Sequence, residues 1–108
     1  MERIYNKLVR DNIPKIIENK GELPVIRVLS NNEYKKALEN KLYEEYKEVI
    51  EASGNERCEE LADMLEVLKA LAKLEGKDLN DIINISNEKN IKRGSFNKKI
   101  FLEKVITK

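Results

Sequence analysis

Two pairs of carboxylates in the sequence have the spacing of residues that share one helical face. Glu45 and Glu48 form an E-x-x-E pair, and Glu60 and Asp63 form an E-x-x-D pair. The pairs are symmetric about Gly54, with Glu48 and Glu60 six residues from it and Glu45 and Asp63 nine residues from it. If the chain folds back at Gly54, the four carboxylates arrive at matching heights on two neighbouring helices.

Four carboxylates gathered in this way need a compensating cation. Two like charges about 4 Å apart repel by about 1 kcal/mol even in water, and burial adds a desolvation cost. All four groups are oxygen ligands, which suits a hard ion and does not suit zinc or copper. The sequence therefore predicts a Mg²⁺ site, with Mn²⁺ as a possible substitute, whose ligands are Glu45, Glu48, Glu60 and Asp63.

A long amphipathic helix over about residues 32–52 is expected to carry the first pair. It begins at a capping box in which Ser30 precedes Glu33 by three residues. Apolar residues then recur at helical spacing, so that Glu45 lies in the middle of the apolar stripe and Glu48 at its edge. The stripe consists of Tyr34, Leu38, Leu42, Val49 and Ala52.

A second helix, from about residue 56 to residue 75, is expected to carry the other pair. Gly54 ends the first helix and Asn55 is the predicted N-cap of the second. Glu60 falls on the apolar side of this helix and Asp63 on its border. The connection is short, which predicts that the two helices are antiparallel neighbours.

The remaining elements complete a mainly α fold in a single domain over residues 1–108. A short helix follows Pro14, and another begins at Asp78 and ends near Arg93. Two β-branched or apolar segments, at about 25–28 and 100–106, suggest a short two-stranded β element. A chain of 108 residues buries a thin core, so we expect a second chain to complete it.

Composition excludes several classes of function. The chain has no His, which removes His-based catalysis and His-ligated metals. Its single cysteine, Cys58, indicates a reducing compartment, and no apolar run is long enough to span a bilayer or to serve as a signal peptide. A net charge of +1 provides no global field for a polyanion. We therefore expect a cytoplasmic protein that binds neither nucleic acid nor membrane.

Charge is nevertheless segregated along the chain. From residue 39 to residue 66 there are ten acidic and three basic residues, whereas residues 89–102 carry five basic residues and no acid. The basic run alone is typical of a solvated helix end. Beside a carboxylate-held cation, however, it provides what a polyphosphate substrate needs. The candidate substrate-binding residues from this charge pattern are Lys7, Arg10, Lys89, Lys92 and Arg93.

Three segments together carry a resemblance to a known family. The carboxylate quartet is similar to that of the all-α nucleoside triphosphate pyrophosphohydrolases, the MazG-like superfamily. The opening over residues 5–14 (YNKLVRDNIP) and the closing over residues 92–103 (KRGSFNKKIFLE) resemble its phosphoribosyl-ATP pyrophosphohydrolase-like branch. Only eleven residues separate Glu48 from Glu60, at or just under the lower limit usual in that family.

The resemblance implies Mg²⁺-dependent cleavage between the α and β phosphates of a nucleotide, giving a monophosphate and pyrophosphate. It also implies a homodimer or higher homo-oligomer, in which the antiparallel hairpin completes a four-helix-type bundle by dimerisation. It assigns the metal to Glu45, Glu48, Glu60 and Asp63. Glu45 is then catalytic through the metal, and the flanking Glu44 is the candidate for orienting the attacking water. Asn87, Lys89, Lys92 and Arg93 align loosely with polar and basic groups near the phosphates.

Two alternatives are compatible with the same residues. In the first, the chain is a non-catalytic helical dimerisation or interaction module whose carboxylates only form salt bridges. In the second, it is a degenerate family member that binds a nucleotide without hydrolysing it. Metal binding separates the first alternative from the enzyme, and pyrophosphate release separates the second.

Overall fold

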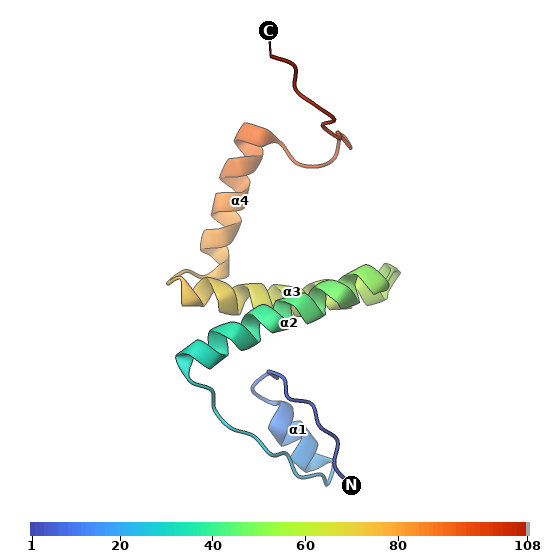
Figure 1. The fold of residues 1–108 in the computed structure, drawn as a ribbon, viewed down its shortest axis with the longest axis vertical. Coiled ribbons are helices and arrows are strands. Elements are labelled where there is room, and N and C mark those ends of the chain that lie inside the picture. Colours follow the sequence, from blue (N-terminus) through green and yellow to red (C-terminus); the bar gives the residue numbers. More distant parts are fainter. Residues whose placement is uncertain (108) are drawn as a thin grey trace.

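The fold is known from a computed structural model that describes residues 1–107, and it consists of helices joined by turns and irregular segments (Figure 1). Among these residues there are four helices and no strand, which confirms the mainly α prediction. The helices are α1 (Ile13–Asn19), α2 (Asn31–Glu51), α3 (Gly54–Leu74) and α4 (Leu79–Arg93).

The two segments expected to pair as strands are irregular in this chain. Residues 25–28 and 100–106 have no strand assignment, and their side chains are exposed. A two-stranded ribbon is marginal unless a helix covers it, and α4 separates these two segments along the chain. Their pairing stays a prediction.

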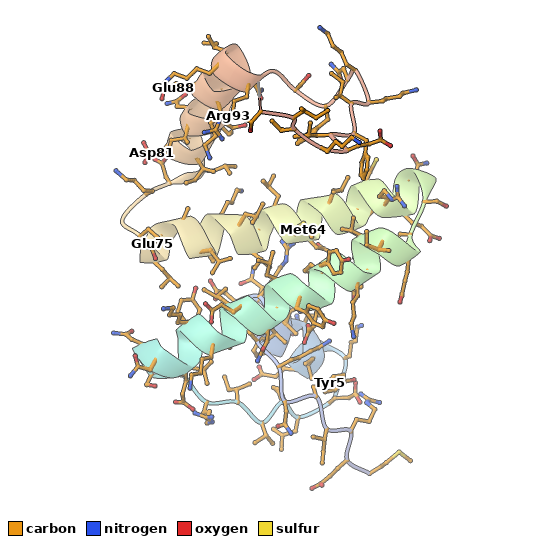
Figure 2. All side chains as sticks on the ribbon, turned by 45° about the horizontal axis from the view of Figure 1, so that its top comes forward. Tyr5, Met64, Glu75, Asp81, Glu88 and Arg93 are labelled. Carbon is orange, nitrogen blue, oxygen red and sulfur yellow. The ribbon has the colours of Figure 1, made fainter. Side chains whose placement is uncertain are left out.

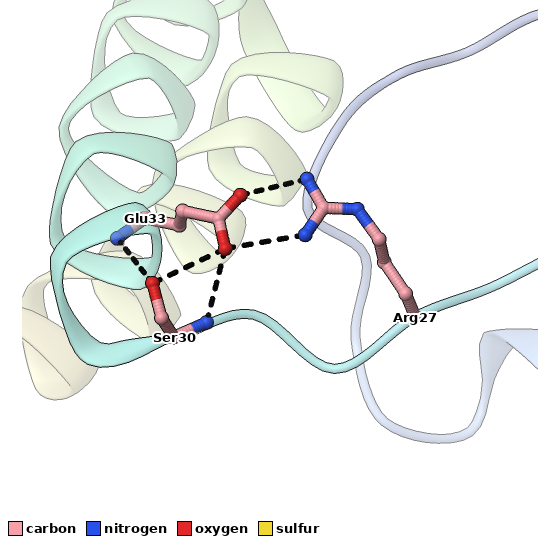
Figure 3. Close-up of polar contacts among 3 residues, drawn as sticks. All are labelled: Arg27, Ser30 and Glu33. Atoms are coloured by element: carbon pink, nitrogen blue, oxygen red, sulfur yellow. Dashed lines mark hydrogen bonds and ion pairs between the residues drawn. The ribbon is translucent and has the colours of Figure 1, made fainter.

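The predicted capping box forms at the start of α2. The Ser30 hydroxyl accepts a hydrogen bond from the Glu33 amide, and the Glu33 carboxylate accepts one from the Ser30 amide. Arg27 adds a bidentate ion pair, with its two terminal nitrogens 3.2 and 2.7 Å from the two Glu33 oxygens (Figure 3). This contact ties the irregular segment before α2 to the first turn of the helix.

The turn between α2 and α3 is tighter than the sequence predicts, because α3 begins at Gly54 with Ser53 as its N-cap. Asn55, the predicted cap, lies inside the helix instead. Gly54 has a φ of +59°, a conformation that glycine adopts without steric cost. The reversal is therefore complete within two residues, and α2 and α3 lie side by side as an antiparallel hairpin (Figure 1).

Arg57 stabilises the same turn from α3. Its Nε donates hydrogen bonds to the carbonyl oxygens of Val49 at 3.2 Å and Ala52 at 2.9 Å. The last turn of α2 contains no basic residue, and its final carbonyls have no partner within the helix. The Arg57 cation supplies that partner and complements the negative end of the helix dipole.

Helix α4 extends away from the hairpin. It starts at a second capping box, formed by Asp78 and Asp81, and ends at Gly94. In both Figure 1 and Figure 2 it leaves the end of α3 at a steep angle, on the side of the hairpin opposite the N-terminal segment. Of the helices in residues 1–107, α4 packs against α3 alone.

The core of the single chain is thin. Among residues 1–107 the buried apolar side chains are Leu38, Val67 and Ala72. The accessible surface is 10350 Å², whereas a compact monomer of 12.6 kDa exposes about 6,200 Å² by the size scaling of folded proteins. The radius of gyration is 18.8 Å, against about 13 Å expected for this length. The hairpin and α4 thus leave apolar faces uncovered.

Candidate metal centre

The hairpin brings three of the four predicted metal ligands to one point. Glu45 of α2 and Glu60 and Asp63 of α3 each place a carboxylate oxygen within 4.8 Å of the others. These residues lie nine, six and nine positions from Gly54 along the chain, so the symmetric turn is what aligns them. The grouping expected from the sequence therefore exists in the folded chain, and we call these three residues with Glu48 the carboxylate cluster.

Glu48 lies at the edge of the cluster, as its position on the helical face predicts. Its side chain is exposed, and it does not belong to the group of three that converges within 4.8 Å. It nevertheless adjoins Glu45 and Glu60, and its charge contributes to raising the pKa of both.

Burial and mutual repulsion change the acidity of the cluster. Glu45 is 5% exposed, and burial followed by the charge of Glu48 raises its pKa. Hydrogen bonding to Glu48, then burial and the neighbouring carboxylates, raise the pKa of Glu60 to about 7. One oxygen of Glu45 and one of Glu60, Oε2 in each, are buried without a hydrogen-bond partner. Such orphaned acceptors are costly in a folded protein.

In the part of the chain that the structure describes, two basic side chains reach the cluster. Lys41 Nζ lies 3.7 Å from Glu45 Oε1, and Arg10 donates a hydrogen bond of 2.8 Å to Asp63 Oδ1. The i,i+4 spacing of Lys41 and Glu45 could have indicated the first contact. The second joins residues 53 positions apart and has no local signal. With all four carboxylates ionised, as binding of a cation requires, these two basic side chains leave a formal charge of −2.

Glu44, the candidate for orienting water, flanks the cluster from the solvent side. Its side chain is 42% exposed, and its Oε2 lies 3.4 Å from Lys41 Nζ. Lys41 therefore lies between Glu44 and Glu45, within 4 Å of both carboxylates. The lysine holds the two glutamates in a fixed relation on one turn of α2.

The remaining predicted substrate-binding residues lie elsewhere in the single chain. Lys7 Nζ lies over the ring of Tyr5, 5.7 Å from its centroid. The candidates on α4 have exposed side chains, and α4 makes no contact with α2. Figure 2 shows Arg93 on α4, away from the hairpin. The α4 candidates are Asn87, Lys89, Lys92 and Arg93.

The chemistry of the cluster fits a hard divalent cation. Its donors are carboxylate oxygens only, its formal charge matches a doubly charged ion, and its two orphaned oxygens lack the partner that such an ion provides. Two surface hollows, of about 340 and 350 Å³, lie at the elbow between α3 and α4 and beside the start of α2. Neither hollow includes a residue of the cluster.

Comparison with known proteins adds one partial match. No protein-family model matches this chain, and no solved structure matches it. The chain is 54% identical over 43 residues to an uncharacterised protein of Mycolicibacterium smegmatis. The match covers 40% of this chain and 44% of the relative. Among the residues that the structure describes, no helix is both long enough and apolar enough to cross a membrane.

Proposed function

We propose that this protein is a cytoplasmic, Mg²⁺-dependent nucleotide pyrophosphohydrolase that cleaves between the α and β phosphates. The observation that carries the proposal is the buried Glu45 carboxylate, which has an unpartnered oxygen in a cluster of formal charge −2. A side chain in this state is stabilised by a cation and destabilised without one. The resemblance of the opening and closing segments to MazG-like enzymes supports the choice of substrate.

The residues that hold the metal are Glu45, Glu48, Glu60 and Asp63. A bound Mg²⁺ supplies charge neutralisation for the phosphates and acidifies a bound water. The raised pKa of Glu60 means that its proton must leave when a cation binds. Glu48, which adjoins Glu60 and is exposed, provides a route for that proton to solvent.

Glu44 and Lys41 act beside the metal ligands. Glu44 is half-exposed next to Glu45, so its carboxylate is placed to accept a hydrogen bond from a water near the cluster. The Lys41 ammonium lies within 4 Å of both glutamates and adds a positive charge beside them. The basic side chains of the N-terminal segment and α4 then bind the phosphates as counter-charges.

A second copy of the chain completes the enzyme in this proposal. The surface in excess of a compact monomer, about 4,000 Å² by the size scaling, exceeds the area that a standard stable interface buries. It includes exposed apolar side chains on α3 and α4, such as Leu61, Leu65 and Ile82. Within one chain α4 lies apart from the cluster, so a homodimer also supplies the α4 cations from the neighbouring copy.

A pyrophosphate-release screen over nucleoside triphosphates and related nucleotides tests the proposal. With Mg²⁺ or Mn²⁺ at least one substrate should yield a monophosphate and pyrophosphate, and EDTA should stop the reaction. Ca²⁺ should bind and support little turnover, because it is larger and less strict in geometry. Release of orthophosphate alone would contradict cleavage between the α and β phosphates.

One observation favours a second candidate function, that of a helical interaction module. Tyr43 and Tyr46 stack on the outer face of α2 with ring centroids 6.2 Å apart, and Lys47 lies over the Tyr43 ring. Both tyrosines are more than half exposed, and aromatic side chains are enriched at protein interfaces. A protein that self-associates and binds no divalent cation would be this module. One that binds metal and nucleotide without releasing pyrophosphate would be a degenerate relative.

A further inference from the structure

Among residues 1–107, the basic side chain that reaches the carboxylate cluster from outside the hairpin is Arg10. Its carbonyl oxygen accepts a hydrogen bond of 3.0 Å from the Ile13 amide, in the turn that opens α1. This bond holds the Arg10 backbone at the start of the helix. The guanidinium extends from that point to Asp63 Oδ1, where it forms an ion pair of 2.8 Å.

The two cations at the cluster are held differently. Lys41 shares a helix with Glu45, one turn before it, and its side chain is only 21% exposed, so it stays beside the cluster. The Arg10 side chain is 56% exposed and its partner Asp63 is 45% exposed. Exposed ion pairs are weak because water competes for both charges. Arg10 is therefore the cation that can be exchanged.

A divalent cation and Arg10 compete for the same carboxylate. Asp63 supplies one of the three oxygens that converge within 4.8 Å, and a doubly charged ion there repels a guanidinium on the same residue. Displaced from Asp63, the guanidinium remains tethered next to the metal by its fixed backbone. Its planar fork matches two oxygens of a phosphate, which a lysine ammonium does not.

We propose that Arg10 acts as an exchangeable counter-cation, which neutralises Asp63 in the metal-free protein and moves to a substrate phosphate when a divalent cation binds. This inference rests on the proposed function and adds to it a residue that binds phosphate only after the metal. It predicts opposite effects of removing Arg10: metal alone binds more tightly, and phosphate binds more weakly. A residue that merely orients Asp63 would weaken both.

Titration calorimetry on the full chain tests the exchange with two probes. Mn²⁺ alone should bind Arg10→Ala about three- to tenfold more tightly than the wild type, because one competing charge is gone. Inorganic pyrophosphate in saturating Mg²⁺ should bind the same variant about tenfold more weakly, and Arg10→Lys should restore part of that loss. Arg3→Ala is the matched control, since Arg3 pairs with Glu22 in another exposed ion pair of the N-terminal segment, and it should change neither affinity.

The outcomes separate this inference from the proposed function. If Mn²⁺ binds the wild type and not Asp63→Asn, while Arg10→Ala leaves Mn²⁺ affinity unchanged or weaker, the exchange is wrong and the metal site stands. Unchanged pyrophosphate affinity in Arg10→Ala also overturns the exchange. If the wild type binds no divalent cation at all, both the exchange and the pyrophosphohydrolase fail. Circular dichroism of each variant, compared with Arg10→Lys, excludes loss of folding as the cause.

Discussion

Carboxylates in two places, at the N-terminus of α2 and in the cluster between α2 and α3, have opposite electrostatic states. Glu33 accepts hydrogen bonds from Arg27 and Ser30, which lower its pKa to about 2. In the carboxylate cluster, burial and neighbouring acids raise the pKa of Glu45, and hydrogen bonding to Glu48 with burial raises that of Glu60 to about 7. The residue type is the same, and the surroundings differ in the number of donors they offer.

This difference separates a structural carboxylate from one that is ready for a ligand. At Glu33 each oxygen has a donor from Arg27 and the backbone of Ser30 supplies another, so the ionised form is satisfied and the helix start is stabilised (Figure 3). In the cluster, Oε2 of Glu45 and of Glu60 has no donor. Counting donors around a carboxylate therefore distinguishes the two roles where counting acidic residues in the sequence does not.

The largest effect should come from removing a charge inside the cluster. Glu60→Gln should lower pyrophosphate release by about 100-fold or more, because a group that stabilises transition-state charge is lost with the metal ligand. It should also abolish the Mg²⁺-induced rise in melting temperature, which for a native-state ligand follows RT ln(1 + [L]/Kd). In EDTA the variant should melt higher than the wild type, because repulsion is relieved.

Glu59→Gln is the matched control for that experiment. Glu59 neighbours Glu60 on α3 but is exposed, so its neutralisation should leave the Mg²⁺ response and the activity intact. Glu45→Gln and Asp63→Asn should behave like Glu60→Gln in their loss of Mg²⁺ response. A lower melting temperature in EDTA together with an unchanged Mg²⁺ response would identify the cluster as a set of salt bridges.

An intermediate effect is expected from the cations of α4, which bind the substrate phosphates in the proposed function. Arg93→Ala and Lys89→Ala should each lower kcat/KM by about tenfold while leaving Mn²⁺ affinity unchanged, and Arg93 should show the larger loss because its fork holds two phosphate oxygens. Their folding should be nearly intact, since exposed substitutions usually cost under about 0.5 kcal/mol. Lys36→Ala, an exposed change on α2, is the control. Unfolding of Arg93→Ala would assign it to structure.

The pH dependence of stability should run in opposite directions at the two groups. Glu60 has a pKa raised from 4.5 to about 7, so its contribution is present below about pH 4.5 and is lost as the pH rises through 7. Glu33 has a pKa lowered from 4.5 to about 2, so its contribution is present above about pH 4.5 and is lost as the pH falls toward 2.

Thermal melts in EDTA across pH 2 to 8 measure both the loss of stability toward acid pH and the loss toward neutral pH. Glu60→Gln should flatten the decline in melting temperature between pH 5 and 8 and leave the decline at acid pH unchanged. Glu33→Gln should do the reverse. A wild-type protein whose metal-free stability rises between pH 5 and 8 would show that the cluster is not a site of repelled charge.

The smallest effect should come from the helix caps. Ser30→Ala should cost about 1 kcal/mol of stability, because the hydroxyl that accepts a hydrogen bond from the Glu33 amide is lost. Ser53→Ala is the matched comparison at the start of α3, where the serine side chain makes no capping hydrogen bond, and it should cost little. Neither change should alter Mg²⁺ binding. Equal losses in the two variants would contradict the assigned capping at Ser30, and melting curves measure both.

Local signals in the sequence were sufficient for the helices. The capping box at Ser30, the stop at Gly94 and the position of α4 were all predicted within one or two residues, because they depend on contacts between neighbours along the chain. The start of α3 was misplaced by two residues. There the positive φ of Gly54 and the reach of Arg57 across the turn decided the geometry, and neither is a property of a single residue type.

The sequence by itself determined that the carboxylates of two helices would meet, since the spacing of Glu45, Glu60 and Asp63 about Gly54 sets their heights once the hairpin closes. Only the tertiary structure decided how they are neutralised. The pairing of Arg10 with Asp63 spans 53 residues, and the orphaned oxygens of Glu45 and Glu60 follow from burial between two helices. Periodicity along one chain describes which face a residue occupies, whereas charge compensation depends on every segment that packs against that face.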